Sequence, residues 1–167
     1  MKEPALVLIK PDGIIKGLVG NVFLKFAQAD LEIVAVRIAV ASRELAEKHY
    51  KHLRGKLFFE EIVDYLAGDY HQSNRLIAAI YYGPRAIKKC RQIAGATNPE
   101  EADPQTIRGS FGRITTKGVF ENVVHVSSGN EEAEREIKLW FDPDEILAEL
   151  YPTRIKNMNA HKKRVWL

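Results

Sequence analysis

Residues 5–13 read ALVLIKPDG, an apolar run that is closed by a lysine and the turn-forming sequence Pro-Asp-Gly. A short apolar run bounded by proline and glycine is typical of a buried strand that enters a tight turn. Further apolar or β-branched runs occupy residues 33–41, 76–82 and 123–126. We therefore expect a sheet of four short strands.

Helical spacing of apolar residues appears between and after these strands, at residues 19–26, 45–53, 59–66, 87–94 and 133–141. The expected helix starts are Ser42 and Asn130 as N-terminal caps and Pro84 as a first helical residue. Gly68 and Gly95 are the expected helix ends.

The resulting order is strand, helix, strand, helices, strand, helix, loop, strand, helix. It predicts an α/β (α+β) fold, namely a ferredoxin-like four-stranded antiparallel sheet of βαββαβ order, with additional helices and with the helices on one face. Residues 95–121 lack periodicity, and we expect them to form one long ordered loop at the active site. We expect residues 1–150 to form the domain and residues 151–167 to form a basic C-terminal extension.

Composition narrows the class of protein. The 167 residues are 46% hydrophobic and 28% charged, which suits one packed domain, and the net charge of +3 suits a small anionic ligand better than nucleic acid. Cys90 is the only cysteine and falls at helical spacing, so we expect a buried thiol and neither a disulfide nor a thiolate zinc site. There is no signal peptide and no apolar run long enough to cross a bilayer, so we expect a cytoplasmic protein.

Residues 122–127 read NVVHVS and place His125 at the end of a β-branched run, where a sheet would hold its side chain rigidly. Glu136, in the following helix, could fix one imidazole nitrogen and leave the other free to attack. Taken alone, His125 is better explained as a structural histidine, and a surface glutamate explains Glu136 as well as a catalytic role does.

Residues suited to phosphate precede the histidine. Arg91 and Arg108 offer guanidinium forks that match phosphate oxygens, and Thr97 adds a hydroxyl. Of Phe58 and Phe59, one should enter the core and the other could stack on a base. The chain lacks a Walker A motif, a dinucleotide glycine fingerprint, a kinase catalytic loop and a dense acidic cluster. A covalent phosphohistidine would serve a phosphate-handling enzyme that lacks them.

The chain resembles the nucleoside diphosphate kinases over about residues 5–141. The matching motifs are, in order, KPDG (10–13), GLVG (17–20), HY (49–50), FF (58–59), GATNP (95–99), TIRG (106–109), NVVH (122–125) and EIKLWF (136–141). The resemblance implies a ping-pong enzyme that transfers the γ-phosphoryl group of a nucleoside triphosphate, such as ATP, to a nucleoside diphosphate.

The resemblance also implies roles for individual residues. His125 would be phosphorylated on Nδ1, Glu136 would bond the other ring nitrogen, and Tyr50 would support the histidine. Phe59 would stack on the base, with Val63 beside it. The implied nucleotide-binding residues are Lys10, Phe59, Val63, Arg91, Thr97, Arg108 and Asn122.

Partners follow from the same resemblance. Mg²⁺ would arrive with the nucleotide phosphates rather than in a site fixed by the protein. The partners would be nucleoside di- and triphosphates and further copies of the chain, in a hexamer or tetramer, with no membrane and no nucleic acid.

Departures from the family pattern leave two alternatives open. Ser110 and Ser128 stand where aspartates are usual, Val126 stands where a small residue is usual, and the segment from Arg108 to His125 is a few residues longer, around residues 114–120. A catalytically weak member that acts as a nucleotide-binding or scaffold protein is the first alternative. A ferredoxin-like RNA-binding module, suggested by the basic tail, is the second, but no RNP-like run lies on an expected strand.

Overall fold

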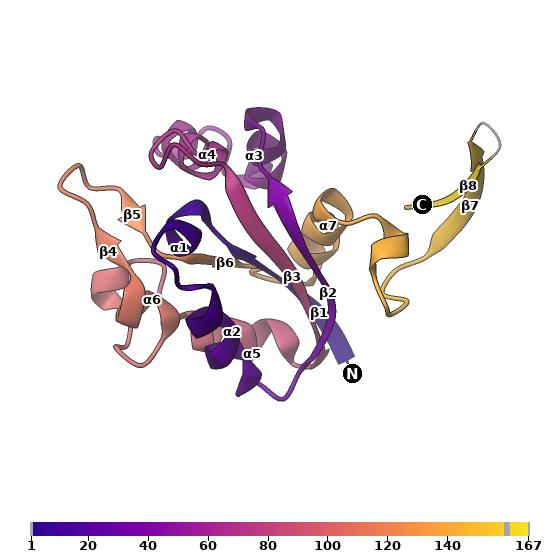
Figure 1. Ribbon diagram of the computed structural model, residues 1–167, viewed down its shortest axis with the longest axis horizontal. Helices are drawn as coiled ribbons and strands as arrows, with labels where there is room; N and C mark the ends of the chain where they lie inside the picture. The colour runs from indigo at the N-terminus through magenta and orange to yellow at the C-terminus, as the bar shows by residue number, and fades with distance from the viewer. Residues whose placement is uncertain (1, 159–160, 167) are drawn as a thin grey trace.

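The structure, a computed structural model, describes residues 2–158 and 161–166 (Figure 1). Its centre is a four-stranded antiparallel sheet in the order β2-β3-β1-β6, which confirms the expected ferredoxin-like arrangement. The strands are β1 (Lys2–Ile9), β2 (Glu32–Val40), β3 (Arg75–Pro84) and β6 (Val124–Val126).

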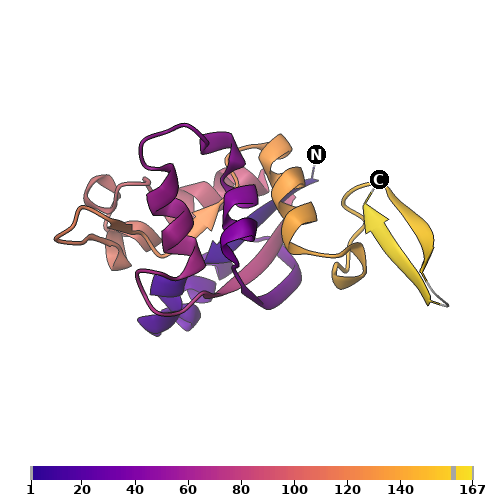
Figure 2. The ribbon, with the colours of Figure 1, turned by 90° about the horizontal axis from the view of Figure 1, so that it is seen from above.

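Helices cover both faces of the sheet, so the expectation of helices on one face is wrong (Figures 1 and 2). One face carries α2 (Val19–Ala27) and α5 (Ala86–Ala94), and the other carries α3 (Arg43–His49), α4 (Phe59–Ala67) and α7 (Asn130–Trp140). The reason lies in residues 5–9 of β1, whose side chains are all buried and alternate between two different hydrophobic clusters. An unbroken apolar run is the pattern of such a doubly covered strand.

Most helix ends agree with the sequence. The Ser42 hydroxyl accepts a hydrogen bond from the Leu45 amide at 3.1 Å, and Gly68 ends α4 in the left-handed conformation. Pro84 does not begin a helix: it is the last residue of β3, where a missing N–H costs little, and α5 begins at Ala86. Asn130 is the first residue of α7 rather than its cap. The turn after β1 is itself a short helix, α1 (Pro11–Ile15).

The segment 95–121 contains several short elements, so the expectation of a single loop is wrong. They are a 3₁₀ helix (Pro99–Glu101), α6 (Ile107–Phe111) and a hairpin of β4 (Arg113–Ile114) and β5 (Phe120–Glu121). None of these elements exceeds five residues, which is too short for a periodic pattern to appear.

The C-terminal extension forms a second hairpin, of β7 (Thr153–Met158) and β8 (His161–Trp166), which projects from the body (Figures 1 and 2). The Trp166 indole donates a hydrogen bond to the Phe141 carbonyl at 3.1 Å, and its ring lies 6.0 Å from that of Tyr151. Further 3₁₀ helices span Lys51–Leu53 and Pro143–Glu145. Among the described residues, no helix has the length and apolar character needed to span a bilayer.

Candidate active site

His125 lies on β6, opposite Leu8 of the central strand β1. Its Nε2 is 3.0 Å from Oε1 of Glu136 on α7, so the expected pairing of these two side chains is present. The second oxygen of Glu136 accepts a hydrogen bond from the Ser127 hydroxyl at 2.7 Å. A carboxylate partner at Nε2 favours a proton on that nitrogen and leaves the Nδ1 lone pair available for attack.

Glu136 is 1% exposed, yet it keeps its charge. Burial raises the pKa of its carboxyl group, but the neighbouring His125 and the hydrogen bonds from His125 and Ser127 outweigh this and lower the pKa to about 2. The guanidinium of Arg135 lies 3.6 Å away. At neutral pH the group is therefore a fixed anion behind the imidazole.

His49 and Tyr50 pack edge-on against the His125 ring, with ring centroids 4.4 and 6.3 Å from it. Burial lowers the pKa of His49 well below its usual value, so His49 is neutral. Its Nδ1 accepts a hydrogen bond from the Trp140 indole at 3.2 Å. These contacts help to fix the plane of the His125 ring.

His49, His125 and Glu136 form the one group of three possible metal ligands among the residues described, with ligand atoms within 4.8 Å of one another. The Nδ1 lone pair of His49 already accepts the Trp140 hydrogen bond, and a neutral imidazole has no second lone pair. The group suits an oriented nucleophile better than a metal centre.

A cavity of about 510 Å³ opens beside His125. This volume lies within the usual range for small-molecule sites. Eight of the residues expected from the sequence line the cavity, namely Lys10, Tyr50, Arg91, Thr97, Arg108, Asn122, His125 and Glu136.

Positive charge is held at the cavity by Arg108. This side chain is 9% exposed, and its guanidinium donates to the carbonyls of Gly95 at 2.9 Å and Val124 at 3.0 Å. Burial, followed by the neighbouring charge of Arg91, lowers the pKa of Arg108 to about 10, so it remains a cation at neutral pH. The two carbonyls use only part of its donor set, which leaves N–H groups for an anionic ligand.

Lys10 directly follows β1, and Asn122 lies two residues before β6, which pairs with β1. The Lys10 ammonium lies 4.1 Å from the centre of the Tyr65 ring, and burial lowers its pKa to about 8. The Asn122 amide donates to the Thr97 carbonyl at 2.7 Å. Val123, between Asn122 and β6, has a positive φ of 66°, which is costly for a β-branched residue. Two hydrogen bonds hold this conformation, because the Val123 carbonyl accepts from the Lys10 amide and the Val123 amide donates to the Asp12 carboxylate.

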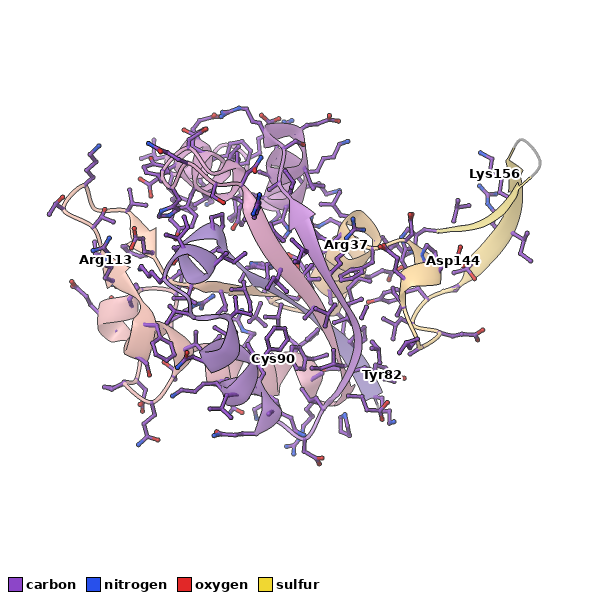
Figure 3. All side chains as sticks on the ribbon, in the orientation of Figure 1. Arg37, Tyr82, Cys90, Arg113, Asp144 and Lys156 are labelled. Carbon is purple, nitrogen blue, oxygen red and sulfur yellow. The ribbon has the colours of Figure 1, made fainter. Side chains whose placement is uncertain are left out.

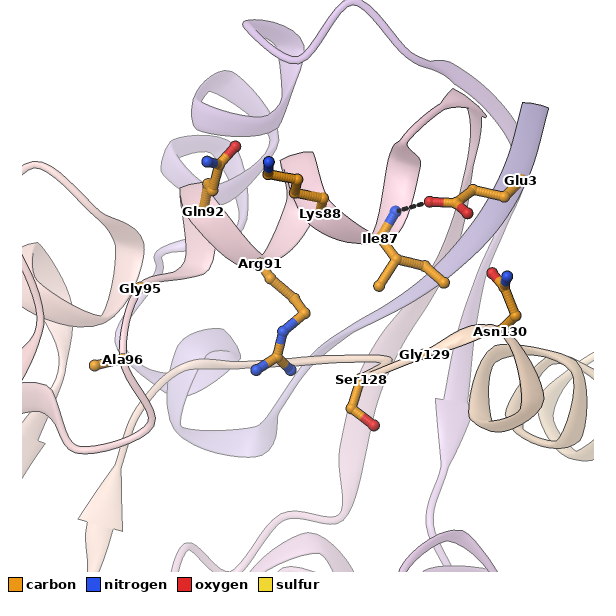
Figure 4. A pocket seen from close by; sticks show the side chains of 10 residues that line it. All are labelled: Glu3, Ile87, Lys88, Arg91, Gln92, Gly95, Ala96, Ser128, Gly129 and Asn130. Carbon is orange, nitrogen blue, oxygen red and sulfur yellow. Dashed lines mark hydrogen bonds between the residues drawn. The ribbon is translucent and has the colours of Figure 1, made fainter. Parts of the chain in front are cut away.

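A second, shallower depression of about 710 Å³ lies on the other side of Arg91 (Figure 4). Its walls are α5 and the segment that leads into α7, and Arg91 extends from α5 toward Ser128 across it. Arg91 and Ser128 line both spaces, so Arg91 is exposed at the rim of the His125 cavity rather than buried within it.

The sequence model for nucleoside diphosphate kinase matches residues 3–146 of this chain. The chain belongs to the nucleoside diphosphate kinase family. Nucleoside diphosphate kinases similar to it include those of Pyrococcus furiosus, 41% identical over 144 residues, and Archaeoglobus fulgidus, 45% identical over 145 residues. The matches cover 86% of this chain and 86% of the first relative, and 87% and 90% for the second.

Solved structures of nucleoside diphosphate kinases share the fold. The enzyme from Borrelia burgdorferi, a transition-state mimic with vanadate and ADP, gives a TM-score of 0.79 at 29% identity and covers 89% of this chain and 92% of its own. The enzyme from Halobacterium salinarum, in complex with CDP, gives 0.78 at 32% identity and covers 89% and 93%. The chain is therefore a phosphotransferase by family.

The expected roles of Phe59 and Val63 are wrong. Phe59 is 6% exposed and Val63 is fully buried, and both belong to the core beneath α4. The cavity is lined instead by Phe58 and Ile62, each one position earlier in the chain. The helix explains this, because Phe59, Val63 and Leu66 form its buried stripe and the residues just before the first two lie on the neighbouring face.

Several lining residues were not expected from the sequence, among them Tyr65, Gly118, Val119 and Phe120. Tyr65 has no signal beyond its place in an amphipathic helix. The other three belong to the segment that was expected to be longer than the family pattern, and this expected length was their only signal in the sequence.

The other departures from the family pattern have local partners. The Ser128 hydroxyl donates to the Glu132 carboxylate, and the Ser110 hydroxyl donates to the Pro104 carbonyl at 2.7 Å. Val126 is buried in the sheet. Cys90, on α5, is buried as well (Figure 3).

Proposed function

We propose that this chain is an active nucleoside diphosphate kinase that works through a phosphohistidine on His125. The observation that carries the proposal is the bond between His125 Nε2 and the buried, ionised Glu136, with the ring at a cavity lined by Arg91 and Arg108. A histidine oriented in this way, beside cations suited to phosphate, is equipped for nucleophilic attack on phosphorus.

In the first half-reaction, Nδ1 of His125 attacks the γ-phosphorus of a nucleoside triphosphate. The N–P bond forms, the bond from the γ-phosphorus to the β,γ-bridging oxygen breaks, and the nucleoside diphosphate leaves with the bond electrons. The Nε2 proton stays on the ring, where Glu136 offsets the positive charge that develops. In the second half-reaction, a terminal β-phosphate oxygen of another nucleoside diphosphate attacks the same phosphorus. The new O–P bond forms, the N–P bond breaks, and its electron pair returns to Nδ1, so that His125 is neutral again.

The remaining lining residues divide by chemistry. Arg91, Thr97 and Arg108 would bind the phosphates. Lys10 and Asn122 would bond the ribose hydroxyls, with Lys10 also reaching the phosphates. The base would stack on Phe58, in place of the expected Phe59, and an aromatic face accepts any base.

Magnesium enters this reaction as part of the substrate. The carboxylates that line the cavity are those of Glu61 and Glu136, and Glu136 is already engaged with His125 and Ser127. Such a lining does not offer the several oxygen ligands of a resident magnesium site, which suits an ion that the nucleotide phosphates bring with them.

Assembly into a homo-oligomer, a hexamer or tetramer, belongs to the same proposal. Strand β2 is an edge of the main sheet, and it exposes Ile33, Val36, Ile38 and Val40 at 46%, 50%, 72% and 59%. Exposed apolar side chains on an unpaired edge strand favour association with another chain. We place the activity in the cytoplasm, where nucleoside di- and triphosphates are held.

The test is intact-protein mass spectrometry after mixing with ATP and magnesium at neutral pH. We expect one added phosphoryl group, which mild acid removes and GDP discharges. The His125→Ala variant should gain no mass, whereas His52→Ala, which removes another histidine of the same cavity, should still gain it. If the wild-type protein binds ATP but never gains mass, the scaffold alternative replaces this proposal.

A further inference from the structure

The hairpin of β4 and β5 supplies one wall of the nucleotide cavity. Gly118, Val119 and Phe120 line the cavity together with Phe58 and Ile62 from the start of α4. In Figure 1 the hairpin and α4 lie at the same end of the molecule. This wall therefore combines a two-stranded hairpin with the start of a helix that lies far from it in the sequence.

Local hydrogen bonds close the hairpin tightly. The Thr115 amide donates to the Val119 carbonyl at 2.9 Å, and the Gly118 amide donates to the Thr115 carbonyl at 2.9 Å. The Val119 amide also donates to the Thr115 hydroxyl at 3.1 Å. Gly118 adopts a φ of 80°, a conformation that favours glycine. Val119 directly follows this turn, and Phe120 is the first residue of β5. The position of Phe120 is therefore set by a strand.

Glu121 holds the hairpin to the body. Its carboxylate is 7% exposed and accepts from the Lys16 ammonium at 2.6 Å and from Arg113 Nε at 2.6 Å. The His71 ring approaches the same carboxylate at 4.0 Å. Arg113 lies across the hairpin, Lys16 follows α1 and His71 precedes β3, so one carboxylate joins three separate parts of the chain.

Successive side chains of a strand point to opposite faces. Because Glu121 turns toward Lys16, Phe120 turns the other way, to the cavity that it lines. Phe120 remains 37% exposed and Phe58 remains 48% exposed. Two aromatic rings from different elements thus leave apolar surface open at the same cavity, next to the residue proposed to bind the ribose, Asn122.

We propose that Phe120 is a second base-contacting ring, and that it makes the site favour purine over pyrimidine nucleotides. The inference rests on the proposed function and adds its base selectivity. A purine offers two fused rings, so it can contact Phe120 while it stacks on Phe58, whereas a single pyrimidine ring has less surface to share. Stacking of one base on one aromatic side chain is sufficient for about a tenfold change in affinity.

The experiment compares kcat/KM for GDP, ADP, CDP and UDP as acceptors, with the pre-formed phosphoenzyme as donor, in the wild type and in Phe120→Ala. We expect the variant to lose about tenfold for the two purine acceptors and less than about threefold for the two pyrimidine acceptors. The Phe120→Leu variant keeps the apolar bulk without an aromatic face, and its purine preference should fall between the two.

Ile114→Ala is the matched control, because Ile114 pairs with Phe120 across the hairpin but does not line the cavity. It should leave the purine-to-pyrimidine ratio within about twofold of wild type. An unchanged ratio in Phe120→Ala, or an equal loss for all four acceptors, would overturn the inference. Phosphoenzyme would still form in either case, whereas failure of the proposed function would show as no phosphoenzyme in the wild type.

Discussion

The charge on Glu136 is the feature of the site that a single substitution tests most directly. Glu136→Gln keeps an oxygen facing His125 Nε2 but removes the negative charge that would balance the developing imidazolium. A hydrogen bond to a charged group contributes ~1.5–3 kcal/mol, so we expect phosphoenzyme formation to slow by about 10- to 100-fold. Rapid-quench measurement of a single turnover with ATP gives this rate.

The control for that substitution is Glu132→Gln, on the same helix α7. The Glu132 carboxylate contacts Ser128 rather than His125, so the rate should stay close to wild type. Equal rates for Glu136→Gln and wild type would mean that Glu136 orients the ring without acting through its charge.

Lys10 gives the site a pH dependence above neutrality. Because burial lowers the pKa of Lys10 to about 8, the free enzyme loses this positive charge as the pH rises through that value. We expect kcat/KM for nucleoside diphosphates to decline above about pH 8. A Lys10→Arg variant, which keeps its charge, should lack this decline, and a profile that is flat in both proteins would argue against a contact between Lys10 and the nucleotide.

The same shift affects stability with a definite sign. The unfolded chain holds the Lys10 proton up to its ordinary pKa of 10.5, whereas the folded chain releases it near 8. The unfolded state therefore binds more protons between these values, and the Lys10 contribution makes the free energy of unfolding rise with pH across that range.

Some of the residues that line the cavity could be predicted from the sequence, and others could not. Lys10, Arg108 and Asn122 were predicted because each stands in a short motif that matches the family, namely KPDG, TIRG and NVVH, and each lines the cavity. The pair Phe58 and Phe59 predicted one core ring and one free ring, but the choice between them depended on the rotation of α4. Helix phase relative to the sheet is set by packing, which a motif does not contain.

At the scale of elements, the hairpin of β4 and β5 should act on binding rather than on chemistry. Glu121→Gln removes the ion pairs with Lys16 and Arg113 that fasten it. We expect KM for nucleoside diphosphates to rise several-fold with kcat nearly unchanged, because the wall loosens while the His125 pair is untouched. Steady-state kinetics measures this, with Glu100→Gln, an exposed carboxylate of the preceding segment, as control. A fall in kcat at constant KM would contradict it.

Acid should loosen the same hairpin. Burial raises the pKa of Glu121, but its bonds to Arg113 and Lys16 outweigh this and lower the pKa to about 2 from an ordinary value of 4.5. The stabilisation by these ion pairs is therefore complete above about pH 4.5 and is lost as the pH falls toward 2.

Elements differ in how well the sequence predicted them, and length is the reason. The strands β1, β2 and β3, of eight to ten residues, and the amphipathic helices carry enough residues for a periodic pattern, and the three-residue strand β6 was found from its β-branched run instead. The two-residue strands β4 and β5 and the five-residue helix α6 are too short for such a pattern, although the turn of the hairpin depends on a single glycine, Gly118. The unbroken apolar run of residues 5–9 in β1 is the sequence pattern that indicates coverage of both sheet faces.

At the scale of the whole molecule, the site forms because segments that are distant in the sequence meet at one end of the paired strands β1 and β6. Lys10 follows β1 and His125 lies on β6, which pair directly, while Glu136 reaches the same place from α7. Arg108 is brought there by its bonds to the Gly95 and Val124 carbonyls. The order of the strands in the sheet therefore determines which motifs meet. The motifs themselves do not contain that strand order.

The free edge of that sheet leads to a prediction about assembly. Ile38 is 72% exposed on β2, the outer strand beyond β3, and lies among other exposed apolar residues. A lysine there would place a charge on the edge, which is how sheet proteins prevent edge-to-edge association. We expect Ile38→Lys to lower the molecular mass seen in sedimentation velocity to a smaller species. Leu147→Lys, at a 91% exposed position outside the sheet, should keep the wild-type assembly. An unchanged mass in Ile38→Lys would show that copies of the chain meet through another surface, since a charge on every edge strand would then have no effect on their contact.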